Sequence, residues 1–178
     1  MATFVERDDM RVAWGTAVVA GVIAMIVFAV VEIAFSWAMR GQSPWHPLAV
    51  FGTVTIDALL PDRNAGGGPR TIAAGAALLL VLGALSGLIL AAIVDRVGVV
   101  TAAIAGVVFG LAMFVVDLYG VARIFPMLHD LRDWMSALAY AIQGGLAAGL
   151  YKATTHHERP IVSPAGPDLR DLRHAPLA

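Results

Sequence analysis

The chain contains no cysteine, which excludes disulfide bonds, a thiolate nucleophile, and zinc or iron–sulfur sites with cysteine ligands. Charged residues are also scarce: they make up 14% of the 178 residues, whereas a typical soluble domain has about 25%. The 12 basic and 13 acidic side chains leave a net charge of −1, so no global field attracts DNA or anionic substrates. Together these shortages exclude an ordinary soluble enzyme, a disordered tail and a nucleic-acid-binding protein.

Motifs that carry known chemistry are missing as well. The sequence contains no nucleophile elbow, Walker motif, glycine-rich dinucleotide fingerprint or HExxH zinc motif. The run Gly66-Gly67-Gly68 has no predicted strand before it and no Lys-Ser or Lys-Thr after it, which is typical of a flexible loop. We therefore expect a protein without enzymatic activity and without a bound cofactor.

Long apolar runs are abundant, because 59% of the residues are hydrophobic and the mean hydropathy is +0.79. A helix needs about 20 apolar residues to cross a bilayer, and within lipid a helix satisfies its own backbone hydrogen bonds in one segment. Four runs meet this requirement, at residues 12–39, 71–94, 97–122 and 134–151. The sequence therefore predicts an all-α integral membrane protein, with one bundle of four transmembrane helices at 12–152 between an N-terminal segment, 1–11, and a tail, 153–178.

The connections predict how these helices are arranged. The second and third helices are joined only around Asp95-Arg96, so we expect them to form a tight antiparallel pair. The loop 40–70 contains an apolar segment, 48–60, that is too short to cross the membrane and predicts an amphipathic interfacial helix. A small excess of Lys and Arg places both termini in the cytoplasm and this loop in the periplasm. The tail after Arg159 is rich in proline and charge, so we expect it to be extended.

The two halves of the chain resemble each other. Residues 21–32 read GVIAMIVFAVVE and residues 106–117 read GVVFGLAMFVVD, so an offset of 85 aligns the glycines, the Val-Val pairs and the acids. Such a repeat predicts two helix pairs of the same orientation, related by an axis along the membrane normal. Glycines four residues apart predict close helix packing within the bundle or association with another subunit: Gly83 and Gly87, Gly106 and Gly110, and Gly145 and Gly149.

Two acidic residues lie within the predicted membrane spans. Glu32 and Asp117 occupy equivalent positions in the two halves, each about 10 Å from the bilayer centre and just inside the outer boundary. A buried acid needs a partner, and the candidates are one polar face of the fourth helix and the arginines at the outer helix ends: Ser136, Tyr140 and Gln143, and Arg40, Arg123 and Arg132. Pairing with these groups would fix the helix register, whereas the alternative is a proton or cation relay through the two acids.

Two histidines, His46 and His129, are predicted on the periplasmic side at related positions in the two halves. Neutral imidazoles could hold copper, zinc or a b-type haem, although haem between helices usually has its histidines inside the bundle. The alternative is that each histidine is solvated or hydrogen-bonded. The same alternative applies to His156 and His157 on the opposite side.

Several short elements carry a resemblance: Ser43-Pro44-Trp45, Phe109-Gly110-Leu111-Ala112, Tyr119-Gly120, Phe125-Pro126, Trp134, Gly145-Leu146 and Tyr151-Lys152. Over residues 11–152 the sequence resembles a group of small bacterial inner-membrane proteins with four predicted helices and no established activity. Members often carry the label sodium:proline symporter, but sodium-coupled symporters use inverted repeats and interrupted helices at the membrane midplane, neither of which this sequence predicts. The resemblance implies a bacterial inner membrane and provides no catalytic residues.

The leading hypothesis is a non-catalytic accessory or structural subunit that packs against a larger bacterial inner-membrane complex, such as a respiratory one. Its partners would be the lipid bilayer and other membrane subunits or further copies of itself, and no nucleic acid. One alternative is a small oligomeric transporter of protons, ions or a solute that uses Glu32 and Asp117. A second alternative is an electron-transfer protein that binds haem or a metal through His46 and His129.

Overall fold

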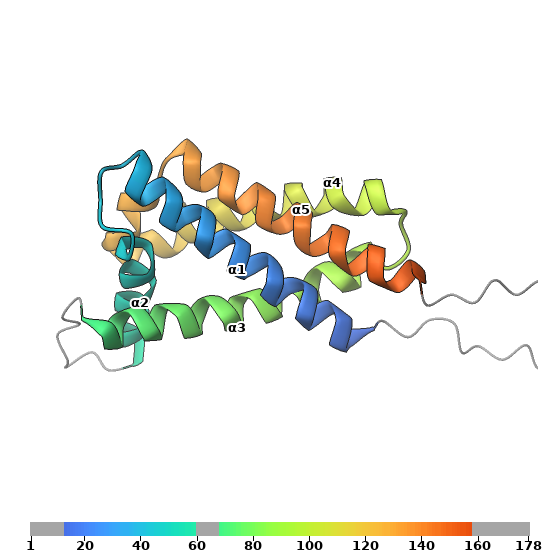
Figure 1. Ribbon diagram of the computed structural model, residues 1–178, viewed down its shortest axis with the longest axis horizontal. Helices are drawn as coiled ribbons and strands as arrows, with labels where there is room; N and C mark the ends of the chain where they lie inside the picture. Colours follow the sequence, from blue (N-terminus) through green and yellow to red (C-terminus); the bar gives the residue numbers. More distant parts are fainter. Residues whose placement is uncertain (1–12, 60–67, 158–178) are drawn as a thin grey trace, which may run out of the picture.

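The computed structural model describes residues 13–59 and 68–157, and every regular element in these ranges is a helix. Four long helices lie along the length of the molecule and a short one, α2, lies across one end (Figure 1). Their bounds are Trp14–Ala38 for α1, His46–Leu59 for α2, Pro69–Val94 for α3, Val99–Val115 for α4 and Trp134–His157 for α5. After α4 the chain continues as a π-helix, η1 (Val116–Gly120), and two 3-10 helices, η2 (Val121–Arg123) and η3 (Pro126–Leu131).

The prediction of an all-α protein is confirmed for the described residues. Within them, three helical stretches are long and apolar enough to cross a membrane: Trp14–Ala38, Pro69–Val94 and Val99–Arg123. The helix α5 is 24 residues long but is not one of these three, because it carries polar residues such as Ser136, Gln143 and Lys152. Three helices of this length and composition indicate a membrane protein.

The helix boundaries lie close to the predicted ones. The first three apolar runs begin and end within two residues of α1, α3 and the stretch from α4 to η2. The predicted interfacial segment forms α2, which begins slightly earlier, at His46. Helix α5 continues to His157, beyond the predicted end at Tyr151. The N-terminal segment, the first two glycines of the glycine run and the tail from residue 158 lie outside the described residues.

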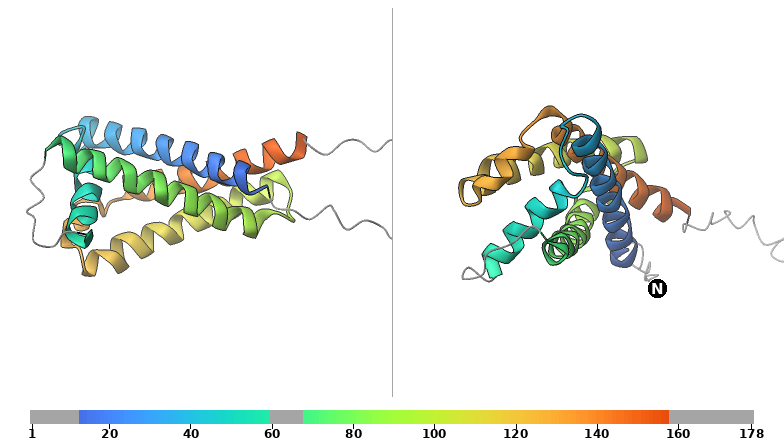
Figure 2. Two further views of the ribbon diagram at one scale, coloured as in Figure 1. Left: turned by 90° about the horizontal axis from the view of Figure 1, so that it is seen from below. Right: turned by 60° about the vertical axis from the view of Figure 1, so that its left-hand side comes forward.

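The long helices form two antiparallel pairs, α1 with α3 and α4 with α5, and contacts between α1 and α5 join the pairs. Helices α1 and α4 run in one direction and α3 and α5 in the other, and α2 lies at the end opposite the start of α1 and the end of α5 (Figures 1 and 2). The predicted tight pairing of α3 with α4 is wrong, because the two helices diverge from their connection at residues 95–98 and make few contacts. A short connection joins two helix ends but leaves the helix axes free to separate.

Glycines determine how closely each helix pair packs. A Cβ atom on Gly21 would lie 2.1 Å from the carbonyl oxygen of Gly83, and one on Gly144 would lie 2.0 Å from that of Gly106. Such distances admit no side chain, so the backbones can approach this closely only at glycine. Gly149 differs from its prediction, because no atom lies within 4 Å of the position of its Cβ. The remaining glycines of the predicted set have close neighbours: Gly87, Gly110 and Gly145.

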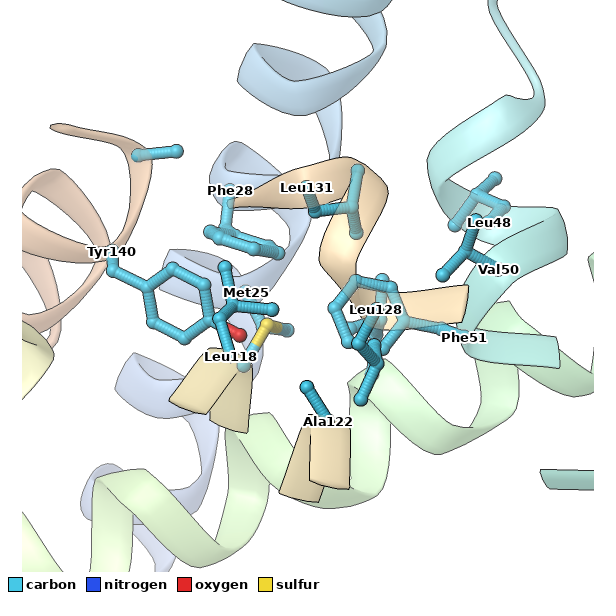
Figure 3. Close-up of a cluster of buried hydrophobic side chains, with 12 residues drawn as sticks. Met25, Phe28, Leu48, Val50, Phe51, Leu118, Ala122, Leu128, Leu131 and Tyr140 are labelled. Carbon is cyan, nitrogen blue, oxygen red and sulfur yellow. The ribbon is translucent and has the colours of Figure 1, made fainter. Parts of the chain in front are cut away.

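Aromatic and branched side chains fill the bundle near α2. Phe28, Phe51, Leu128 and Tyr140 gather there from α1, α2, η3 and α5 (Figure 3). The rings of Phe28 and Tyr140 pack edge to face with their centroids 4.8 Å apart. Toward the opposite end the core consists mainly of alanines from α1, α3, α4 and α5. Small side chains there let the helices converge, whereas the large side chains near α2 hold them apart.

Candidate functional site

Polar side chains on one face of α5 contact three other parts of the bundle. Their spacings of four and three residues place them on the same face of the helix: Ser136, Tyr140 and Gln143. Each forms a hydrogen bond with a different element: Arg40 after α1, Asp117 in η1 and Ser86 on α3. The polar face of α5 is therefore the part of the fold that ties the long helices together.

Arg40 lies at the centre of a charge network near α2. Its Nη1 donates to Glu32 Oε2 at 2.8 Å, and its Nε and Nη2 donate to the two carboxylate oxygens of Asp133 at 2.7 and 2.9 Å. Nη2 also donates to the hydroxyl of Ser136 at 2.9 Å. The side chains of Glu32 and Arg40 are 1% and 8% exposed. One buried cation is thus shared by two carboxylates, while Glu32 Oε1 is buried without a hydrogen-bond partner among the described residues.

Asp133 belongs to this network and also caps α5. Its Oδ1 accepts a hydrogen bond from the backbone N–H of Ser136 at 2.8 Å, which is the usual role of an aspartate before a helix. Burial acts to raise the pKa of Asp133, but the hydrogen bonds from Arg40 and the backbone outweigh burial and hold the pKa below its ordinary value. Burial acts to lower the pKa of Arg40, and the two carboxylates outweigh it and raise that pKa. The Arg40–Asp133 pair is therefore charged at neutral pH.

Asp117 lies in the π-helical turn η1, where the regular hydrogen bonding of α4 ends. Tyr140 donates a hydrogen bond to Asp117 Oδ2 at 2.9 Å. The neighbouring carbonyl of Leu118 accepts hydrogen bonds from Nε and Nη2 of Arg132, whose guanidinium also lies 4.1 Å from the centroid of the Tyr119 ring. Arg132 is thus bound next to Asp117 without pairing with it: the ion pairs among the described residues do not include Asp117.

A small, partly open cavity lies beside Asp117. Its volume is about 20 Å³, and it is lined by polar and apolar side chains from α1 to α5 and η1. The polar lining residues are the two hydrogen-bonded pairs Asp117 and Tyr140, and Gln143 and Ser86. A water molecule needs about 10–15 Å³ of such volume, so this cavity holds about one water and is too small for a solute.

The structure separates the two acids that align in the sequence. Glu32 is paired with Arg40, and Asp117 is hydrogen-bonded to Tyr140, so each contacts one of the predicted candidate partners. Arg123, another candidate, is exposed. Asp133 and Ser86 are not among the residues predicted from the sequence. An aspartate directly before an apolar helix is a capping signal that could have identified Asp133, whereas nothing in the sequence marks Ser86.

The two histidines lie near the α2 end of the bundle. His46 begins α2, and its Nε2 lies 4.0 Å from a carboxylate oxygen of Asp130, while His129 is exposed on η3. Nε2 of His46 is buried without a hydrogen bond to the described residues. In the part of the chain that the structure describes, no group of three or more His, Cys, Asp or Glu side chains could hold a metal ion. The side chains of His156 and His157 lie outside what the structure describes.

None of the protein-family models, curated proteins or solved structures with which this chain was compared matches it.

Proposed function

We propose that this chain is a non-catalytic membrane protein that serves as an accessory subunit of a larger complex in a bacterial inner membrane. The observation that carries the proposal is the outer face of α4. This helix packs mainly on α5. In the most apolar part of the stretch Val99–Arg123, which contains α4, only 17% is buried, against 33% for α1 and 39% for α3. Exposed apolar residues recur every three or four positions along this face: Val100, Ile104, Val108, Leu111 and Val115. A helix with one main neighbour leaves room for a helix of another chain.

The use of the interior polar groups supports the same role. The network around Arg40 and the bonds from Tyr140 and Gln143 connect helices of this chain to one another. Interhelical hydrogen bonds of this kind hold membrane helices together and fix their register. The pocket beside Asp117, in the part of the chain that the structure describes, has room for about one water and is too small for a solute. The interior therefore favours a structural role over solute transport.

We further propose that all four long helices cross the membrane as two repeated pairs, with both termini in the cytoplasm. The 24 residues of α5 extend over roughly 36 Å, which exceeds a hydrocarbon core of about 30 Å. Its polar residues Ser136, Tyr140 and Gln143 are buried against other helices, so they do not need to face lipid. The equal directions of α1 and α4, and of α3 and α5, are those expected of a parallel repeat.

Site-specific photo-cross-linking tests the subunit role. A photoreactive residue in place of Val108 on the outer face of α4 is expected to form an adduct with a different membrane protein in native membranes. Leu85 on α3 is the matched control, because it is also apolar and is 50% exposed. A specific adduct at 108 but not at 85, together with a native mass well above 18.7 kDa, would support the proposal. Adducts with lipid alone at both positions would contradict it.

A second candidate function is proton movement by an oligomer of this chain, and the specific observation in its favour is Asp117. This carboxyl lines the water-sized cavity and has no ion pair among the described residues. In the cross-linking experiment, adducts between two copies of this chain at position 108 would favour this candidate. Glu32 is a weaker proton carrier than Asp117, because Arg40 balances its charge.

A further inference from the structure

The two carboxylates at membrane depth have different electrical surroundings. Glu32 forms an ion pair with Arg40 at 2.8 Å, which balances its charge inside the bundle. Asp117 has the hydroxyl of Tyr140 at 2.9 Å instead, and no Lys, Arg or His nitrogen of the described residues lies within 4.0 Å of its carboxylate. The two acids align in the sequence, yet a cation neutralises only one of them.

The elements packed around Asp117 supply no substitute for a cation. On α5 the facing titratable group is Tyr140, which donates its hydrogen bond to Asp117. Glu32 on α1 carries a negative charge that acts on Tyr140. Arg132, which follows η3, is bound to the backbone of η1 and to a tyrosine ring. The other charged or titratable groups of η2 and η3 are exposed: Arg123, His129 and Asp130. Without a positive partner the ionised form of Asp117 is less favoured than that of Glu32, and protonation removes the unbalanced charge.

The cavity gives this carboxyl space for a water molecule. Its volume of about 20 Å³ is enough for one water molecule. The amide of Gln143 and the hydroxyl of Ser86 line the same space, so a water there has polar partners besides Asp117. A water held between a carboxyl group and an amide can accept and donate protons.

We propose that Asp117 is a proton-binding site and that its carboxyl is protonated at neutral pH. Oδ2 already accepts the hydrogen bond from Tyr140, so the proton resides on Oδ1. Protonation forms the Oδ1–H bond as a hydronium ion in the cavity loses one proton and becomes water, and no electrons are transferred. Glu32 is instead held in the ion pair with Arg40. The site depends on the polar interior alone, so it holds whether or not another subunit covers α4.

Infrared spectroscopy of the full-length protein in phospholipid vesicles tests this inference at neutral pH. The wild-type spectrum minus the spectrum of Asp117→Asn should contain the carbonyl-stretch band of a protonated carboxylic acid. The band should shift to lower frequency in D2O, because the cavity water exchanges the proton. Glu32→Gln should leave the band in place. Tyr140→Phe should keep the band but shift it to higher frequency, because the hydrogen bond to Oδ2 is lost.

The possible results separate clearly. A wild-type protein without the band, or a band that Asp117→Asn does not remove, would overturn the proposal. Loss of the band in Glu32→Gln would assign the proton to the other acid and would overturn it equally. If circular dichroism shows that Asp117→Asn does not fold, Tyr140→Phe decides, since an unshifted band then rules out Asp117. The cross-linking experiment at position 108 is independent of all these outcomes.

Discussion

Replacing Arg40 by methionine removes the centre of the charge network. Methionine retains an unbranched apolar side chain but eliminates the positive charge and the four hydrogen bonds to Glu32, Asp133 and Ser136. Glu32, which is 1% exposed, would then have both carboxylate oxygens unpaired, because Oε1 has no partner among the described residues even in the wild-type protein. Removing one member of a buried ion pair typically costs about 3–5 kcal/mol.

Protonation of the unpaired Glu32 carboxylate would limit the loss of unfolding free energy to a similar size. The stranded carboxylate can take up a proton, which costs a glutamate side chain roughly 3–4 kcal/mol at pH 7 and about 1.4 kcal/mol less for each pH unit below that. We therefore expect Arg40→Met to lower the free energy of unfolding by about 3–4 kcal/mol at pH 7 and by about 1 kcal/mol near pH 5. Adding Glu32→Gln should restore most of the loss, because a neutral amide needs no opposite charge.

Unfolding of the purified protein by SDS in mixed micelles measures these free energies at pH 5 and pH 7. The series consists of the wild type, the two single variants and the double variant. Arg123→Met is the matched control, because Arg123 is exposed and its replacement removes the same charge. The reasoning is refuted if Arg40→Met is no less stable than this control, or if its loss is the same at both pH values and Glu32→Gln does not relieve it.

Three further predictions concern the helix contacts. Gly144→Ala places a Cβ 2.0 Å from a carbonyl oxygen of α4 and should destabilise the protein by roughly 1–3 kcal/mol. Gly149→Ala places its Cβ in open space, so its stability in thermal unfolding should stay within about 1 kcal/mol of the wild type. The pKa of Asp133 is lower in the folded protein than in the unfolded chain. The contribution of Asp133 to stability is therefore complete above the unfolded pKa of about 3.9 and is lost as the pH falls through the folded pKa. Asp133→Asn should flatten the acid limb of a stability–pH curve. Gln143→Leu breaks one hydrogen bond to Ser86 and should cost only about 0.6 kcal/mol in SDS unfolding, and a loss above about 2 kcal/mol would indicate a larger role.

The helices and their apolar character could be predicted from hydropathy alone. Hydropathy is a local property, because the length of an apolar run decides whether it can cross a membrane, regardless of the rest of the chain. The boundaries of α1 and α3 and the position of α2 follow from it. The spacing of Ser136, Tyr140 and Gln143 also placed them on one face of α5 without knowledge of their partners.

Which helices and which polar groups contact one another became known from the packing of the whole bundle. The rotation and tilt of a helix in the bundle depend on all its neighbours, so the sequence could not show that α3 pairs with α1 and diverges from α4. The closest backbone contact of α5 lies at Gly144, one residue before the predicted Gly145, and Gly149 has no neighbour within 4 Å of its Cβ position. The same freedom brings Arg40 between Glu32 and Asp133 and leaves Asp117 without a cationic partner among the described residues. Two acids that are equivalent in sequence therefore become different sites, because the charge state of a carboxyl group within a helix bundle depends on neighbours that only the fold supplies.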